Sequence, residues 1–143
     1  MREAGRMAAV LALAAALLGA APAAAEGGDF QAFGGREGLV RVVDDLWENL
    51  LADPRTRPFF AKANRRRITG QLVDQFCMLL EGPCAYTGGD MRTMHKRHRI
   101  AMAEFNALVE ALQDAMDANG VPFRAQNRLL AKLAPMYRDI VTR

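Results

Sequence analysis

The chain's two histidines, His95 and His98, stand three residues apart. A neutral imidazole binds iron or zinc through one ring nitrogen, while a hydrogen bond holds the other. A zinc site would need further ligands, which the sequence does not offer. A lone histidine is more often a solvated surface group than a ligand, so an iron-binding role for His95 requires a flat apolar slot facing it. Phe60, Ile68 and Leu72 are candidate walls for such a slot.

The two cysteines, Cys77 and Cys84, are separated by six residues. In an oxidising compartment this pair favours a disulfide, and two unpaired thiols are the alternative. Closing so short a loop would stabilise the fold by about 2.5 kcal/mol on the chain-entropy account. The spacing differs from the Cys-x-x-Cys-His pattern, so the cysteines would not attach haem covalently.

The first 25 residues predict a signal peptide. Arg2 and Arg6 precede an almost purely apolar stretch over 7–21, and Ala23-Ala24-Ala25 matches the pattern that signal peptidase reads. The apolar stretch is shorter than the roughly 20 residues that span a bilayer, which disfavours a membrane anchor. We therefore expect cleavage before Glu26 and a periplasmic or secreted protein, with no stable membrane span after cleavage.

The mature chain, residues 26–143, would hold one domain with one core. Removing the signal takes away two of 19 basic and one of 16 acidic residues, which leaves a net charge near +2. Such a charge does not indicate a nucleic-acid partner. We expect a monomer.

Apolar residues at steps of three and four predict helices along the mature chain, whereas sustained strict alternation is missing. In the first long helix this stripe consists of Leu39, Val42, Val43, Leu46, Trp47 and Leu50. The expected long helices span 38–51, 65–80, 102–118 and 124–141, with a short helical piece over 91–96 that carries His95. Residues 26–35 favour an entry turn and 56–60 a single tight turn, and Pro135 should kink the last helix. The prediction is an all-α domain of about five helices.

Several short motifs follow one another along the mature chain in a characteristic order. These are Phe33-Gly34-Gly35, Leu51-Ala52-Asp53-Pro54, Phe59-Phe60, Gly82-Pro83, Tyr86-Thr87-Gly88, Met91 four residues before His95, Ile100, Phe105 and Gly120-Val121-Pro122. None is specific alone, but their order across the mature chain resembles a group I truncated haemoglobin. The resemblance implies a two-over-two helical sandwich around haem b, with His95 as the proximal iron ligand and Phe60 against the porphyrin.

The distal side departs from that family. Trp47 stands where the family has a tyrosine, and Ile68 and Leu72 occupy positions where a glutamine is frequent. Trp47 brings one N–H donor and no hydroxyl, or is simply a core aromatic. Gln71 and Gln75 lie nearby, but the helical rotation that would aim them is open. With few donors, the pocket should lose oxygen quickly and oxidise readily.

Basic residues surround the expected haem site. Arg97 and Arg99 stand in a turn where the family tends to have glycines, and either could pair with a haem propionate or be solvated. His98 could compete for iron. The run 65–67 of three arginines is expected to be exposed, or to attract propionates or an acidic electron-donor protein.

The leading functional hypothesis is a haem protein that binds O2 or NO opposite His95. One alternative is a haem enzyme, either an NO dioxygenase fed by a periplasmic electron donor or a peroxidase-like protein. No reductase domain is present in these residues and no distal acid or base stands out, so no catalytic residue is assigned. Another alternative is a haem-free interaction module with a globin shape, or a haem carrier.

Overall fold

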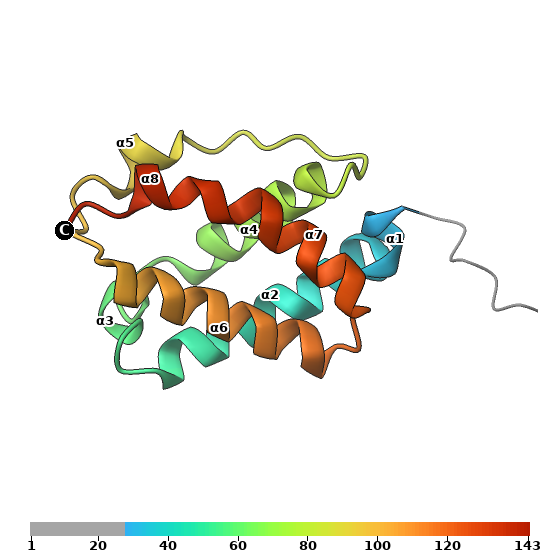
Figure 1. Cartoon of the computed structure of the whole chain (residues 1–143), viewed down its shortest axis with the longest axis horizontal. Coiled ribbons are helices and arrows are strands. Elements are labelled where there is room, and N and C mark those ends of the chain that lie inside the picture. Colours follow the sequence, from blue (N-terminus) through green and yellow to red (C-terminus); the bar gives the residue numbers. More distant parts are fainter. Residues whose placement is uncertain (1–27) are drawn as a thin grey trace, which may run out of the picture.

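The computed structural model describes residues 28–143, which fold into helices (Figure 1). The elements are α1 (Asp29–Ala32), α2 (Gly35–Ala52), α3 (Arg57–Phe60), α4 (Arg65–Leu79), α5 (Met91–His95), α6 (Met102–Ala118), α7 (Phe123–Leu133), a 3-10 turn η1 (Ala134–Met136) and α8 (Tyr137–Ile140). The predicted signal peptide lies outside the described residues. Among those residues, no helix has the length and apolarity needed to cross a bilayer.

Four long helices form two layers. Helix α2 packs against both α4 and α6, while α7 contacts α4 and α6. The pair α2 and α4 therefore lies over the pair formed by α6 with α7 and α8, as Figure 1 shows. The all-α, two-over-two prediction is confirmed.

The core lies where α2 meets its neighbours. All six apolar residues predicted to line the inner face of α2 are buried, so that prediction is confirmed. Phe76 of α4, Leu112 and Met116 of α6, and Leu129 of α7 complete the centre with 2% exposure or less. Fully burying one such side chain contributes about 1.5–3 kcal/mol.

Residues Asp29–Ala32 are helical, so the prediction that the entry segment holds no element is wrong there, whereas Phe33 and Gly34 form a turn as expected; residues 26 and 27 lie outside the described residues. Helix α1 is one turn in which the Gly28 carbonyl accepts from the amides of Gln31 and Ala32. So short a helix has little intrinsic stability, and tertiary packing supplies what local propensity lacks. Phe33, at its end, is 3% exposed and belongs to the core.

Glycine allows α1 and α2 to meet closely. Gly34 precedes α2 with a φ of 82°, a backbone conformation that glycine adopts without strain. At Gly38, an added Cβ would lie 1.7 Å from the backbone oxygen of Phe33. This corner lets α2 begin at Gly35, three residues before the expected start.

The last predicted helix is broken near Pro135, as expected. Helix α7 ends at Leu133, and η1 and α8 follow. Proline lacks the N–H for an intrahelical hydrogen bond, which accounts for the change to a 3-10 turn. The expected number of about five helices is too low, because it did not count α1, α3 and α8 as separate helices. Each of these three helices is only four residues long.

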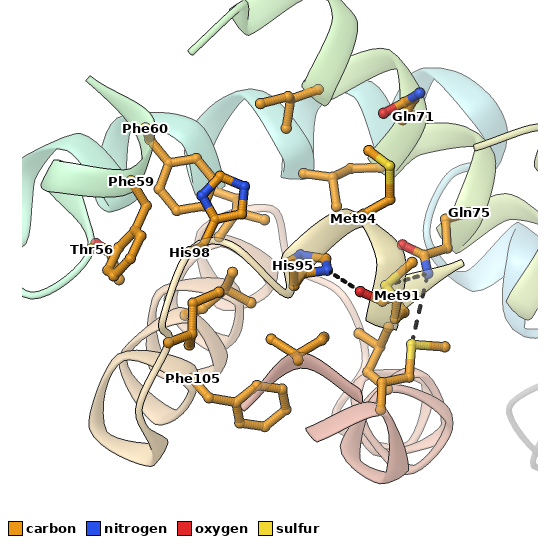
Figure 2. Close-up of a pocket in the computed structure, with 18 of the residues that line it drawn as sticks. Thr56, Phe59, Phe60, Gln71, Gln75, Met91, Met94, His95, His98 and Phe105 are labelled. Carbon is orange, nitrogen blue, oxygen red and sulfur yellow. Dashed lines mark hydrogen bonds between the residues drawn. The ribbon is translucent and has the colours of Figure 1, made fainter. Parts of the chain in front are cut away.

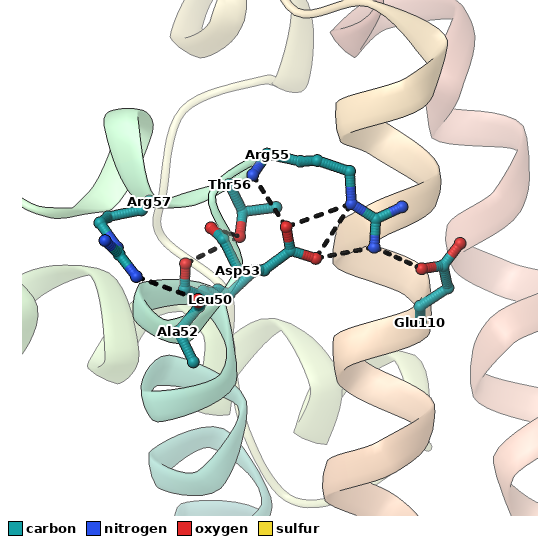
Figure 3. A network of polar contacts seen from close by, with 7 residues as sticks. All are labelled: Leu50, Ala52, Asp53, Arg55, Thr56, Arg57 and Glu110. Atoms are coloured by element: carbon teal, nitrogen blue, oxygen red, sulfur yellow. Dashed lines mark hydrogen bonds and ion pairs between the residues drawn. The ribbon is translucent and has the colours of Figure 1, made fainter.

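A polar network fixes the corner between α2 and α3 (Figure 3). The buried Thr56 hydroxyl donates to the Leu50 carbonyl over 2.7 Å. Arg55 binds the carboxylates of Asp53 and Glu110, joining the corner to α6, and its side-chain hydrogen bonds lower the pKa of Asp53. The corner holds α3, and with it Phe59 and Phe60, in place.

Candidate functional site

A cavity of about 430 Å³ opens between α4, α5, α6 and the C-terminal helices. This volume falls in the range of cofactor and small-molecule sites. Its walls are mostly apolar. They consist of Leu46, Phe59, Phe60, Ala63, Ile68, Leu72, Phe76, Met91, Met94, Ile100, Phe105, Leu108, Val109, Leu112, Leu133, Met136 and Ile140, with the polar residues Thr56, Asn64, Arg67, Gln71, Gln75, Tyr86, His95, His98 and Glu104.

His95 is the half-buried histidine of this cavity, at the end of α5. Its Nδ1 lies 2.7 Å from the Met91 carbonyl oxygen (Figure 2). A carbonyl oxygen only accepts hydrogen bonds, so Nδ1 carries the proton in the neutral ring. Nε2 is then left with a lone pair, which is the state in which histidine binds a metal.

Helix α5 is held at several points. The Asp90 carboxylate caps it by accepting the Thr93 amide over 2.9 Å, and this hydrogen bond lowers the pKa of Asp90. Arg92 forms a 2.5 Å ion pair with Asp139 of α8. Beyond α5, the Ile100 carbonyl accepts the Thr142 amide over 2.9 Å. The C-terminal segment thus braces His95 from both sides.

The Asp90 cap predicts an acid-sensitive step. Its folded-state pKa lies below the ordinary value of about 4. In this range the unfolded chain binds more protons, so the stability contributed by the cap is present above pH 4 and is lost as the pH falls through the folded pKa. Asp90→Asn keeps a side-chain cap without titrating.

Acid unfolding followed by circular dichroism should therefore depend less steeply on pH below about 5 in Asp90→Asn than in the parent chain. Asp90→Ala, which removes the cap, is the control for its overall contribution. Identical pH dependence in the parent and Asp90→Asn would contradict the role given to this carboxylate.

Cys77 and Cys84 form a disulfide, so the predicted bond is confirmed. Cys77 is fully buried in α4, and Cys84 lies in the loop that leads to α5. The bond therefore ties the loop that precedes His95 to helix α4, which forms a wall of the cavity.

Tyr86, in the same loop, lines the cavity. Its hydroxyl donates a hydrogen bond to the Gly89 carbonyl over 3.0 Å, and burial raises the pKa of Tyr86.

Reducing this disulfide should lower the free energy of unfolding by about 2.5 kcal/mol, because the bond restricts the unfolded chain. Urea unfolding with and without reductant measures the difference. The double variant Cys77→Ala/Cys84→Ala should be insensitive to reductant. Two reactive thiols in the untreated parent would contradict the bond.

The α4 wall resolves the helical rotation that the sequence leaves open. Ile68 and Leu72 line the cavity as predicted, and Gln71 and Gln75 line it as well. Gln75 is 6% exposed, and its Nε2 points to the sulfur atoms of Met136 at 3.7 Å and Met91 at 4.0 Å. Thioether sulfur is a weak acceptor, so both hydrogen bonds that Nε2 donates to these two sulfur atoms are weak.

Phe60 lines the cavity, whereas Trp47 does not belong to its lining. Trp47 is 3% exposed and meets Phe60 edge to face, with ring centroids 5.6 Å apart. This placement fits the alternative of a core aromatic that supports Phe60. A direct role of Trp47 toward a ligand stays a prediction.

The mouth of the cavity is basic. Arg67 and His98 belong to its lining, whereas Arg97 and Arg99 are exposed and lie outside it. Arg67 is exposed, as predicted for the run 65–67, and it also lies where that run could attract haem propionates. The signal for its place in the lining was present in the spacing, because residues 67, 71 and 75 follow one another at four-residue steps beside 68, 72 and 76, and all six line the cavity.

The metal-ligating side chains at the cavity fit an iron atom held in a flat macrocycle better than they fit a free metal ion. Within residues 28–143, no group of three or more His, Cys, Asp or Glu side chains is placed to hold a metal. One imidazole with a free ring nitrogen suffices only if the cofactor supplies the remaining ligands. The apolar walls, with Phe60 among them, fit such a cofactor.

Comparison with known proteins gives the same family as the motifs. Residues 29–142 match the family described as bacterial-like globin. A group 1 truncated haemoglobin of Mycolicibacterium paratuberculosis is 34% identical over 113 residues, 79% of this chain and 83% of that protein. One from Tetrahymena pyriformis is 30% identical and covers 78% of this chain and 93% of its own.

Solved structures agree on the fold. The Fe(III) form of truncated haemoglobin from Tetrahymena pyriformis superposes with a TM-score of 0.77 and 26% identity, over 82% of this chain and all of that chain. The group II truncated haemoglobin of Bacillus anthracis gives a TM-score of 0.72 at 22% identity, over 81% of this chain and 92% of its own. The latter likeness concerns the fold alone.

Proposed function

The chain belongs to the bacterial-like globins, as a group I truncated haemoglobin, and we propose that His95 is the proximal ligand of its haem b iron. The observation that carries the proposal is the hydrogen bond from His95 Nδ1 to the Met91 carbonyl. This bond fixes the ring and its tautomer, and it leaves Nε2 free at the cavity.

Residues in and beside the cavity lining have proposed roles that follow from their chemistry. Phe60, backed by Trp47, offers an aromatic face to the porphyrin. Arg67 and His98 lie at the basic mouth, where charge-assisted hydrogen bonds could hold the propionates. Arg97 and Arg99 stay candidates for the same carboxylates from just outside the lining.

A haem held by His95 would supply an iron atom at which O2 or NO could bind. Ile68 and Leu72 make the α4 wall largely apolar, and its donors are the side-chain amides of Gln71 and Gln75 and, at the mouth, the guanidinium of Arg67. Few donors toward bound oxygen favour rapid oxygen release and oxidation of the iron.

Ligand binding is favoured over enzyme chemistry for a structural reason. Glu104 is the cavity's carboxylate, and it is occupied by the Ala101 amide at 2.6 Å and by Arg143 at 2.7 Å. It is therefore poorly placed to serve as a general acid or base. Haem-enzyme activity and a haem-free interaction role stay the alternatives.

Titration of the purified chain with hemin tests the proposal. We expect one haem per chain, a sharp Soret band, and a shift of that band when carbon monoxide is added to the ferrous form. A spectrum indistinguishable from free hemin would overturn haem binding and favour the interaction module.

We also propose that the protein acts in the periplasm or outside the cell. The basic start, apolar stretch and alanine-rich site of the first 25 residues support this location, and the disulfide is consistent with it. Cell fractionation with N-terminal sequencing should yield a periplasmic or secreted chain that begins at Glu26. A cytoplasmic chain that retains residues 1–25 would contradict export.

A further inference from the structure

Five exposed cations lie in or close to the segments whose residues line the cavity. We define the basic rim as Lys62, Arg67, Lys96, Arg97 and Arg99. Arg67 lines the cavity, Lys62 directly precedes two lining residues, and the other three flank the lining residue His98. All five are exposed, and within residues 28–143 none forms an ion pair.

The charge of the basic rim is not balanced locally. Residues 54–73 and 91–103 contain neither aspartate nor glutamate. Asp53, Asp74 and Glu104, which border or closely follow these segments, and Asp139 of α8 are each already paired with an arginine. Within residues 28–143, Asp90, which directly precedes the second segment, is the one bordering acid without an arginine partner, and its carboxylate accepts the Thr93 amide. A haem would bring two propionates, which are fewer than the five rim cations. The mouth therefore keeps a positive excess on a chain whose net charge is only +3.

We propose that the basic rim docks an acidic one-electron carrier protein, which reduces the ferric iron of bound haem. The inference rests on the proposed function. Only ferrous iron binds oxygen, and a carrier docked on the basic rim would lie close to the cavity that would hold the cofactor. One electron passes from the reduced carrier to ferric iron, which leaves an oxidised carrier and ferrous iron. No covalent bond forms or breaks.

An anionic membrane is the other surface that such a rim could meet, and the observations favour the protein. Membrane-surface segments combine cations with exposed apolar side chains that insert below the headgroups. The large exposed apolar residues of the described chain are Val40, Met78, Met102, Phe123 and Tyr137. None of them lies in the segments 57–67 and 91–99 that form the rim, which suits a polar protein interface.

The test uses the haem-loaded chain and reduced flavodoxin, an acidic one-electron carrier. A Soret band measured first on the same sample separates failure of haem binding from failure of docking. Binding by calorimetry and reduction by stopped flow are then measured at about 10 mM and about 150 mM salt. We expect both the affinity and the second-order rate to fall at least about tenfold at the higher salt.

Two charge-reversal pairs locate the effect. Lys62→Glu/Lys96→Glu should lower both affinity and rate about tenfold at low salt, because steering at the mouth is reversed. Arg41→Glu/Arg124→Glu makes the same change in net charge at two exposed arginines that do not belong to the basic rim and form no ion pair within residues 28–143, and it should change either value less than about twofold. If the first pair fails to fold, Lys62→Gln/Lys96→Gln should show the same direction with a smaller change.

Equal effects of the two pairs would overturn the basic rim as a docking surface, and so would a rate independent of salt. Haem-loaded chain that ignores flavodoxin but binds phosphatidylglycerol vesicles through Lys62 and Lys96 would replace the protein partner with a membrane.

Discussion

Replacing His95 with alanine is expected to abolish the spectrum of a histidine-ligated haem. The change removes the cavity's half-buried imidazole, whose Nδ1 is already committed to Met91. Haem affinity should fall at least tenfold, which corresponds to about 1.4 kcal/mol of lost binding free energy. The Soret shift on adding carbon monoxide to the ferrous form should change or disappear. Hemin titration and ferrous–CO spectra of the two proteins measure both effects.

His98→Ala is the matched control, because His98 also lines the cavity but is exposed. It should leave the parent spectrum in place. Added imidazole should restore histidine-type ligation in His95→Ala, which separates loss of a ligand from loss of the fold. A parent-like spectrum in His95→Ala would contradict proximal ligation, and its disappearance in His98→Ala would move the ligand to His98.

Phe76→Ala is expected to be the most destabilising of the substitutions considered. Phe76 is 2% exposed, belongs to the core and also lines the cavity. Truncating a buried phenylalanine costs about 3–5 kcal/mol, because transfer free energy is lost and a void remains. That is a large part of the 5–15 kcal/mol by which domains are typically stable. Urea unfolding of the haem-free chain measures it.

Phe123→Ala makes the same chemical change at a side chain that is 72% exposed. Its free energy of unfolding should stay within about 0.5 kcal/mol of the parent. A difference below about 1 kcal/mol between the two variants would show that Phe76 does not anchor the core.

The sequence allowed the long helices and their buried faces to be predicted, because a repeat of three and four residues reports directly on burial. The stripe of α2 is an example, from Leu39 to Leu50. Helix α1 escaped prediction because its stability comes from contacts made by Phe33 after folding. The close approach at Gly38 was also invisible, since it depends on a neighbouring backbone oxygen.

The functional site, like the fold, could be predicted only in part from the sequence. His95 and Phe60 could be placed from motif order, and the walls Ile68 and Leu72 from helix spacing. Gln75 could not be assigned, because a small rotation of α4 decides whether it meets the cavity or the core. Met136 lines the cavity from a turn that exists only because Pro135 interrupts the preceding helix.

The loop between the disulfide and α5 has a consequence for how the protein opens. In the part of the chain that the structure describes, no backbone N–H from Ala85 to Asp90 donates to another protein group. Opening this segment therefore breaks no backbone ladder, and its amides should exchange with deuterium long before those of α2. A large flat molecule would then enter or leave the cavity past the segment 85–90. This segment would move between two fixed ends, the disulfide at Cys84 and the Asp90 cap of α5.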